Sequence, residues 1–308
     1  MLVSMDLANL RPGMFVEAVR CPATVFAKRR FFITENEIEV LKQSGTQTVV
    51  VNITKGSHGQ GFPQMPSNRK QALSRASVEG LKIRIHREAT RFGHVMGALR
   101  DGNVVEMSEL RSIVQGLYGF NQPTQRLATA LFRLRTAGND TLLHSLSVAN
   151  LMMGVGRMAG FSARDLKDLG LAGLMHDVGK TKVPPELLNK MGPLTPDERK
   201  IVEHHPSWGC EILNGITDIP SIAKDVCLSH HELLDGSGYP HGLDHSKLSD
   251  ACRIAAVCDV FDALTAKRAY KKPWTAKDAL DWLGRQDTKY DREFLRYLQW
   301  FVLDMPGS

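Results

Sequence analysis

The sequence LGLAGLMHDVGK at residues 169–180 decides the fold class, because it joins an apolar run to a histidine–aspartate pair. The apolar run predicts a helix. His176 and Asp177 follow it directly, and adjacent ligands of these two kinds can serve two metal ions when the aspartate bridges them. Lys180 lies four residues after His176, near enough to meet a phosphate at the same helix end. A lone His-Asp dipeptide is usually structural, so this interpretation needs support from the rest of the chain.

The histidines are concentrated in the second half of the chain. Eight of the 11 lie after residue 143, and most of these are close to a carboxylate or to another histidine. Imidazole and carboxylate together are the ligands that suit divalent iron, manganese and zinc. The eight are His144, His176, His204, His205, His230, His231, His241 and His245.

Two histidine pairs add to this pattern. His230 and His231 are adjacent, and two buried neighbouring imidazoles would be costly to satisfy without a metal. His205 precedes Pro206, which restricts its backbone, but its neighbour His204 competes for the same role. Residue chemistry alone leaves that choice open.

His144 lies four residues after Asp140, so the two side chains share one face if both residues are helical. Asp140 can therefore be a metal ligand next to His144. It can also be the cap of a helix that carries His144, which is the commoner role for an aspartate there.

Two carboxylates and two cations follow another apolar run. Asp259 and Asp262 are three residues apart on one predicted helix face, and Arg268 and Lys271 come next. These four residues form either a salt-bridge network or a metal ligand beside a phosphate clamp.

The composition is that of an ordinary globular protein. The chain has 308 residues, a net charge of +6 and 43% hydrophobic residues, which excludes a disordered or collagen-like chain. Asp6 and Arg11 interrupt the start where a signal peptide needs an apolar stretch, and the least charged stretch, residues 141–156, is too short and polar to span a bilayer. We therefore expect a cytoplasmic protein with no membrane span.

Cysteines and basic runs point to no further chemistry. The five cysteines include no C-x-x-C pair, so free thiols in a reducing compartment are expected. The basic runs at residues 28–30 and 82–91 lack interleaved aromatic residues, so we expect no nucleic-acid polymer as a partner.

The first part of the chain predicts a small α/β unit. Short β-type runs lie at residues 14–16, 31–33 and 48–53. A helix capped by Thr34 and ended by Gly45 is expected between the last two. Residues 55–68 are rich in Gly, Pro and Ser and predict a linker. Two helical segments follow, separated by a break at residues 101–103.

The order and spacing of the motifs from Pro123 to the C-terminus resemble the HD-GYP family of bacterial cyclic-di-GMP phosphodiesterases, within the HD hydrolase superfamily. The first hundred residues, with LRPGMFV at 10–16, resemble an uncharacterised domain that often precedes HD-GYP modules. The motifs that carry the resemblance are T-x-x-HS (141–145), HDVGK (176–180), HP (205–206), HHELLDGSGYP (230–240) and CDVFDALTAKRAY (258–270).

The resemblance implies a role for each matching residue. Asp177 is the implied bridge between metals, and His205 rather than His204 is the implied ligand. Asp140 falls where some members place a carboxylate for a third metal. The implied metal ligands are His144, His176, Asp177, His205, His230, His231 and Asp259.

Other matches imply substrate contacts. Lys180 corresponds to the lysine that approaches the scissile phosphate. Gly238 and Tyr239 belong to the GYP motif, whose tyrosine contacts substrate. Arg268 and Lys271 match the cations for the second phosphate, although Ala269 stands where the family usually has proline.

The resemblance implies two, or with Asp140 three, divalent transition metals, with iron or manganese expected. Cyclic-di-GMP would be hydrolysed to linear pGpG, and further to GMP, by a metal-bridging hydroxide over Asp177 that attacks in line. Lys180 would stabilise developing charge. Asp262 would orient the attacking water, or else pair with Arg268.

Two alternatives remain open at this point. The chain could bind cyclic-di-GMP without hydrolysing it, or dock a diguanylate cyclase or another signalling protein through the loop at 238–240. It could also hydrolyse hybrid cyclic GMP-AMP. The complete ligand set favours hydrolysis over binding alone.

The expected fold is mainly α. An all-helical HD-type hydrolase domain at residues 123–308 follows a small regulatory α/β domain at 1–66 and a helical connector at 67–122. The N-terminal domain is expected to regulate or position the hydrolase, or to form a homodimer.

Overall fold

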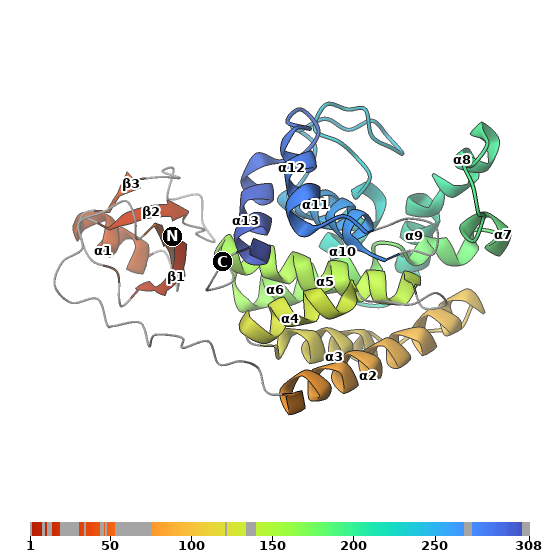
Figure 1. The fold of residues 1–308 in the computed structure, drawn as a ribbon, viewed down its shortest axis with the longest axis horizontal. Helices are drawn as coiled ribbons and strands as arrows, with labels where there is room; N and C mark the ends of the chain where they lie inside the picture. Colours follow the sequence, from red (N-terminus) through yellow and green to blue (C-terminus); the bar gives the residue numbers. More distant parts are fainter. Residues whose placement is uncertain are drawn as a thin grey trace. The chain divides into compact units, whose positions relative to one another are not determined.

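The computed structural model describes residues 2–7, 10, 14–18, 31–33, 35–43, 46, 48–52, 75–120, 122–133, 140–267 and 273–303. The chain forms two compact units, one built mainly from the first 72 residues and the other mainly from residues 73–304. The larger unit is made of helices (Figure 1), so the predicted mainly α architecture is confirmed. The division into 1–66, 67–122 and 123–308 stays a prediction. No described helix combines the length and the apolar character needed to cross a membrane.

The smaller unit contains an antiparallel sheet with the strand order β1-β4-β2-β3. Its elements are β1 (Leu2–Asp6), β2 (Phe15–Ala18), β3 (Phe31–Phe32), α1 (Glu35–Gln43) and β4 (Thr48–Asn52). One apolar cluster joins α1 to the sheet, because Ile38 and Leu41 are buried together with Val16, Val49 and Val51.

The sequence predicted three of these strands and the helix, but missed β1. Its partner β4 follows more than forty residues later, so the pairing that makes it a strand cannot be seen locally. Thr34, Gly45 and the predicted linker at 55–68 lie outside the described residues.

The larger unit begins with two helices that pack on each other, α2 (Arg75–Arg100) and α3 (Met107–Tyr118). The turn between them includes Gly102 at a φ of 76°, a conformation that favours glycine. Because α2 ends at Arg100 and α3 begins at Met107, the predicted break at 101–103 is confirmed. On α2 the buried Glu88 carboxylate pairs with Arg87 and Arg91.

The centre of the larger unit is formed by α5 (Asp140–Met158) and α6 (Ala163–Met175). The middle of α5 is buried on every side, as expected for a core helix. A Cβ on Gly173 would lie 2.8 Å from the Cα of Ala149, so the two helices approach closely at this point. This contact places the end of α6, with His176 and Asp177 directly after it, next to α5.

The remaining elements surround this pair. These elements are α4 (Gln122–Phe132), η2 (Val178–Lys182), α7 (Pro185–Leu188), α8 (Pro196–Val202), α9 (His205–Asn214), α10 (Ser221–Ser229), α11 (Asp250–Thr265), α12 (Ala276–Gly284) and α13 (Arg292–Leu303). Phe301 of α13 contacts Gly154 of α5, and α11 packs against α10, α12 and α13.

Glycine at position 179 is required for η2 to meet α9. A Cβ there would clash with the carbonyl oxygen of His205 and lie 2.5 Å from the amide nitrogen of Gly209. These are backbone atoms that cannot rotate away, so the contact fixes the first turn of α9, where His205 lies.

We expect Gly179→Ala to lower the thermal unfolding midpoint by about 5–10 °C, because overpacking against backbone costs about 3 kcal/mol. The matched control is Gly80→Ala on α2, where nothing lies within 4 Å of the added Cβ. It should raise the midpoint slightly through its better helix propensity. Differential scanning calorimetry measures both, and equal midpoints for the two variants would contradict the packing argument.

Candidate metal centre

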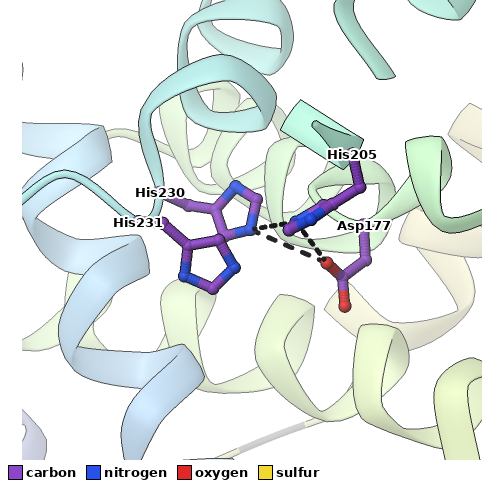
Figure 2. Close-up of side chains that lie close together, drawn as sticks. All are labelled: Asp177, His205, His230 and His231. Atoms are coloured by element: carbon purple, nitrogen blue, oxygen red, sulfur yellow. Dashed lines mark hydrogen bonds and ion pairs between the residues drawn. The ribbon is translucent and has the colours of Figure 1, made fainter. Parts of the chain in front are cut away.

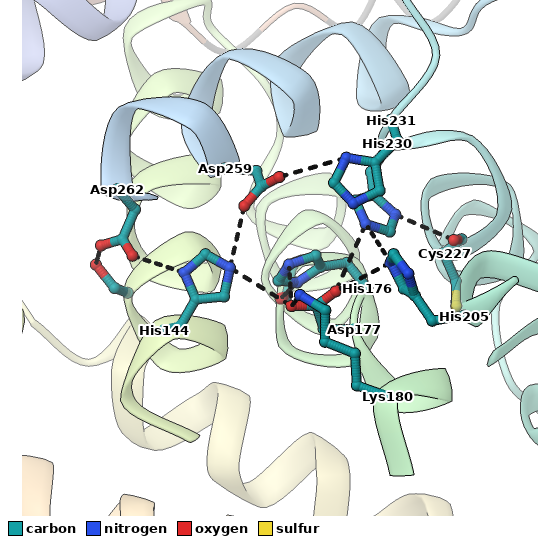
Figure 3. Close-up of polar contacts among 12 residues, drawn as sticks. His144, His176, Asp177, Lys180, His205, Cys227, His230, His231, Asp259 and Asp262 are labelled. Atoms are coloured by element: carbon teal, nitrogen blue, oxygen red, sulfur yellow. Dashed lines mark hydrogen bonds and ion pairs between the residues drawn. The ribbon is translucent and has the colours of Figure 1, made fainter. Parts of the chain in front are cut away.

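Seven histidine and aspartate side chains from five helices or helix ends converge in the larger unit (Figure 3). Their ligand atoms form two groups, and within each group all of these atoms lie within 4.8 Å of one another. The first group is Asp177, His205, His230 and His231 (Figure 2), and the second is His144, His176 and Asp259.

Helix ends and caps position four of these side chains. His205 is the first residue of α9, with Pro206 in its first turn. His230 is the C-cap of α10, and His231 is the next residue along the chain. Ser249 caps α11 by accepting from the Cys252 amide, and the helix then carries Asp259 inward.

Asp177 lies between the two groups. Its Oδ1 is 3.3 Å from His205 Nε2 and 3.6 Å from His230 Nε2. Its Oδ2 is 3.3 Å from His176 Nε2 and 3.6 Å from His144 Nε2. The two oxygens of this carboxylate therefore face different groups of imidazoles, which is the arrangement that a bridging ligand needs.

Asp259 joins the groups at a second place. Its Oδ1 is 3.0 Å from His144 Nε2, and its Oδ2 is 3.8 Å from His231 Nδ1. Both aspartates are almost completely buried. The centre therefore holds two buried carboxylates among five imidazoles, and Lys180 is the one lysine or arginine of the described residues that pairs with Asp177.

Backbone carbonyl groups set the ring orientation of three histidines. The Nδ1 of His176 donates to Gly173 O (2.8 Å), that of His205 to Val202 O (2.7 Å), and that of His230 to the carbonyls of Val226 and Cys227 (both 3.1 Å). A carbonyl oxygen only accepts, so each Nδ1 carries a proton and each neutral ring has its lone pair on Nε2. All three Nε2 atoms face Asp177.

This arrangement leaves an electrostatic conflict that a cation resolves. The Nε2 atoms of His205 and His230 are 3.3 Å apart. When both rings are neutral and carry their proton on Nδ1, two lone pairs meet at that distance and repel. Among the described residues, His176 Nε2 and Asp177 Oδ1 are buried without a hydrogen-bond partner. Inward lone pairs beside carboxylate oxygens are the donor set of divalent transition-metal sites. The residues present fit such ions.

His144 is held by a carboxylate rather than by a carbonyl. Its Nδ1 is 2.6 Å from Asp262 Oδ2, and Ser147 Oγ donates to Asp262 Oδ1 at 2.5 Å. Asp262 thus lies on the side of His144 that faces away from Asp259 and Asp177 (Figure 3). Such a carboxylate–histidine pair orients a metal ligand and raises its basicity.

The pKa values follow from burial and from these contacts. Burial opposes charge on both aspartates, but nearby groups outweigh it: His176 and Lys180 hold the pKa of Asp177 well below its ordinary value, and a hydrogen bond from His144 does the same for Asp259. Burial lowers the pKa of His230 to about 4 and that of His231 well below its ordinary value. These groups are therefore already in the protonation state that metal binding requires.

His144 differs from the other imidazoles. Burial again disfavours its charged form, but the hydrogen bonds to Asp259 and Asp262 are stronger and raise its pKa to about 9. Both of its ring nitrogens then carry protons at neutral pH in the ion-free protein. A metal at Nε2 has to displace one of them.

Lys180 and Tyr239 lie at the more exposed side of the centre. The Nζ of Lys180 is 2.6 Å from Asp177 Oδ2, and a quarter of its side chain is exposed. The half-buried Tyr239 ring stacks on His231 with centroids 4.6 Å apart. Gly238 precedes it with its Cα packed against backbone.

Some predicted site residues are placed elsewhere or lie outside the described residues. His204 is exposed, and its Nδ1 faces Lys200 O, so His205 alone of this pair lies in the centre. Asp140 is the first residue of α5, and its side chain is not among those described, so its role as a ligand or a cap stays a prediction. Arg268 and Lys271 lie outside the described residues.

The structure adds two residues that the sequence analysis did not select. Ser147 lies one turn after His144 on α5 and donates to Asp262. Glu232 directly follows His231 and is buried. Its place immediately after the histidine pair was the only sequence signal for it.

The profile of the HD domain matches residues 117–294, which is more than half of the chain, and that of a domain of unknown function (DUF3391) matches residues 2–110. The chain therefore belongs to the HD domain family. Within this family the resemblance to the HD-GYP proteins is confirmed, because the relatives and the fold agree with it.

Three curated relatives are similar over different lengths. The cyclic di-GMP phosphodiesterase PA4108 of Pseudomonas aeruginosa is 30% identical over 96% of this chain and 76% of its own length. The cyclic di-GMP phosphodiesterase response regulator RpfG of Xanthomonas campestris is 39% identical over 52% of this chain and 42% of its own. The 3'3'-cGAMP-specific phosphodiesterase 2 of Vibrio cholerae is 36% identical over 49% and 29%.

The solved structure of Bd1817, a HDG"Y"P protein from Bdellovibrio bacteriovorus, has the same fold. It superposes with a TM-score of 0.59 over 99% of this chain and 100% of the other. Only 13% of the residues are identical, so this likeness concerns the fold alone.

We expect Asp262→Asn to weaken metal binding by about tenfold or more, because the charged acceptor that orients His144 is lost. Manganese titration followed by calorimetry measures this affinity. Asp281→Asn is the control, since Asp281 forms only a surface pair with Lys277 on α12. Equal affinities in both variants would contradict the role given to Asp262.

Proposed function

We propose that this chain is a metal-dependent phosphodiesterase that hydrolyses cyclic di-GMP to linear pGpG, with GMP as a further product. The observation that carries the proposal is the position of Asp177, which turns one oxygen toward each of two imidazole groups. Two metal ions held in this way are the common solution for phosphodiester hydrolysis.

The choice of substrate is supported by the relatives. PA4108, which matches nearly the whole chain, and RpfG are both named as acting on cyclic di-GMP, whereas the Vibrio cholerae relative is named for 3'3'-cGAMP and matches half of the chain. We therefore place cyclic di-GMP first and cyclic GMP-AMP second. Measured turnover of both substrates decides between them.

Bound ions would supply Lewis acidity, polarising a phosphoryl oxygen and lowering the pKa of water. His144, His176, His205, His230, His231, Asp177 and Asp259 would hold them. Imidazoles with two carboxylates suit divalent iron, manganese and zinc, and the resemblance to the HD-GYP family favours iron or manganese, which are the metals we propose. A third ion at Asp140 is part of the same proposal.

No activated serine accompanies this site among the described residues. Ser147, His144 and Asp262 have the composition of a nucleophilic triad, but the order of their contacts is wrong. The carboxylate of Asp262 lies between the serine and the histidine, whereas a triad needs the histidine next to the serine. The chemistry therefore rests on water rather than on a side-chain nucleophile.

The remaining residues bind and position the substrate. The side chain of Lys180 is partly exposed, so its Nζ can contact a phosphoryl oxygen and offset negative charge as it develops. Tyr239, whose ring stacks on His231, is proposed to contact the substrate. Arg268 and Lys271 are proposed to anchor the second phosphate. Asp262 is proposed to act through His144, which it contacts; the expected orientation of water and the alternative pairing with Arg268 stay predictions.

The N-terminal unit is proposed to regulate or position the hydrolase. Docking of a diguanylate cyclase through the loop at 238–240, formation of a homodimer and a cytoplasmic location stay predictions.

Purified protein loaded anaerobically with ferrous iron or manganese should convert cyclic di-GMP to pGpG. The double variant His176→Ala/Asp177→Ala should lose this activity, because it removes the bridge and one imidazole. Chelation of the metal should do the same to the unmodified protein. Chromatography of the products measures both losses.

His204→Ala is the control for these losses, since the His204 side chain is exposed beside the centre, where its ring faces Lys200 O and the Trp208 ring. It should keep its activity. Robust turnover by the double variant, or tight binding without turnover by every metal-loaded form of the unmodified protein, would refute hydrolysis at this site.

Lys180→Met should lower kcat by about 10²-fold with metal content retained, because a cation aimed at the phosphoryl group is removed. Lys182→Met is the matched control two residues later, where the lysine pairs only with Glu211 on the surface. Steady-state kinetics with metal analysis of both variants measures the difference. Equal kcat values would show that Lys180 does not contact the reacting phosphate.

A further inference from the structure

The loop after the histidine pair folds back onto one buried carboxylate. Glu232 is 1% exposed. Its Oε1 accepts from the amide of His241 at 2.6 Å, and its Oε2 accepts from the amide of Leu243 at 2.9 Å. The two donors lie just after Tyr239 and Pro240, so one side chain closes the loop that carries the tyrosine.

Two backbone contacts fix the other side of this loop. The amide of Tyr239 donates to the carbonyl of His231 at 3.2 Å. A Cβ on Gly238 would lie 2.5 Å from Glu232 Cα and from His231 O, so the chain passes too close for any other residue. The result is that the Tyr239 ring stacks on His231 with an interplanar angle of 27°.

The chemistry of Glu232 is unusual for a residue that only fills space. No described lysine, arginine or histidine forms an ion pair with it, and a buried carboxylate without a cation is costly. Two charge-assisted hydrogen bonds from amides offset that cost. A glutamate in this place holds two specific backbone groups of the loop, which an apolar residue would leave unpaired.

We propose that Glu232 is a positioning residue for substrate binding, which rests on the phosphodiesterase function proposed above. Its carboxylate holds the loop at 238–243 closed, and thereby keeps the Tyr239 ring over His231, where the ring meets the cyclic dinucleotide. Glu232 touches neither the metals nor the substrate, and acts through Tyr239.

The test is Glu232→Gln, which keeps the shape but turns an NH2 group toward one of the two amide donors. We expect KM for cyclic di-GMP to rise on the order of tenfold, with a smaller change in kcat and with unchanged metal content. Asp244→Asn is the matched control, because the Asp244 carboxylate lies in the same loop but is exposed and, among the described residues, accepts hydrogen bonds from Ser246 alone. It should behave as the unmodified protein.

A double-mutant cycle separates positioning from a general loss of structure. If Glu232 acts through Tyr239, then Glu232→Gln should have no further effect on kcat/KM in a Tyr239→Ala background. Additive effects of the two substitutions would overturn the inference. So would a loss of metal from Glu232→Gln in parallel with its activity, since that would place the effect at the histidines.

Hydrogen–deuterium exchange gives a readout that does not depend on activity. In the unmodified protein the amides of His241 and Leu243 should exchange more slowly than those of Ser237 and Ser246, which bond exposed carboxylates. In Glu232→Gln they should exchange faster, while the helix before His176 is unchanged. Unprotected amides in the unmodified protein would overturn the inference even if the variant did not fold.

The two proposals fail in different ways. Absence of turnover by the unmodified protein would refute the phosphodiesterase function. Normal turnover by the unmodified protein, with an unchanged KM for Glu232→Gln, would refute only the role of Glu232.

Discussion

Three backbone carbonyl oxygens hold the Nδ1 protons of His176, His205 and His230, and this constraint turns three Nε2 lone pairs toward the carboxylate of Asp177. With these three rings neutral, the Nε2 lone pairs and the carboxylate repel one another, and a cation bound among them would remove that repulsion. The carbonyls belong to the helix turns that precede each histidine. These helix turns therefore fix the direction of each Nε2 atom, and the metal centre depends on that orientation.

A second set of carboxylates lies behind the ligands and has a different purpose. Asp262 fixes His144 from α11, and Glu232 fixes the loop that carries Tyr239. Each accepts two hydrogen bonds and is buried, so neither is free to move toward a metal. The inner aspartates face the imidazole Nε2 atoms and would hold the ions, while the outer carboxylates hold the groups around them in place.

The helices supply the rigidity that this arrangement needs. Two glycines let elements approach at backbone distance: Gly173 between α5 and α6, and Gly179 between η2 and α9. These contacts lie on either side of His176 and Asp177. A site built on such close contacts has little freedom to relax, which suits ligands that have to meet within a few tenths of an ångström.

The sequence by itself determined the helical class, the ligand types and their order, because HDVGK, the histidine pair and Asp259 are visible as local motifs. It could not show strand β1, whose partner lies far along the chain, or the role of Asp262. The contact of Asp262 with His144 joins residues 118 positions apart. Which nitrogen of a ring faces inward, and whether a carboxylate meets a metal or a histidine, depend on side-chain directions that only the packed helices set. Local sequence patterns therefore indicate which ligand types are present, and tertiary packing decides the direction in which each ligand atom points.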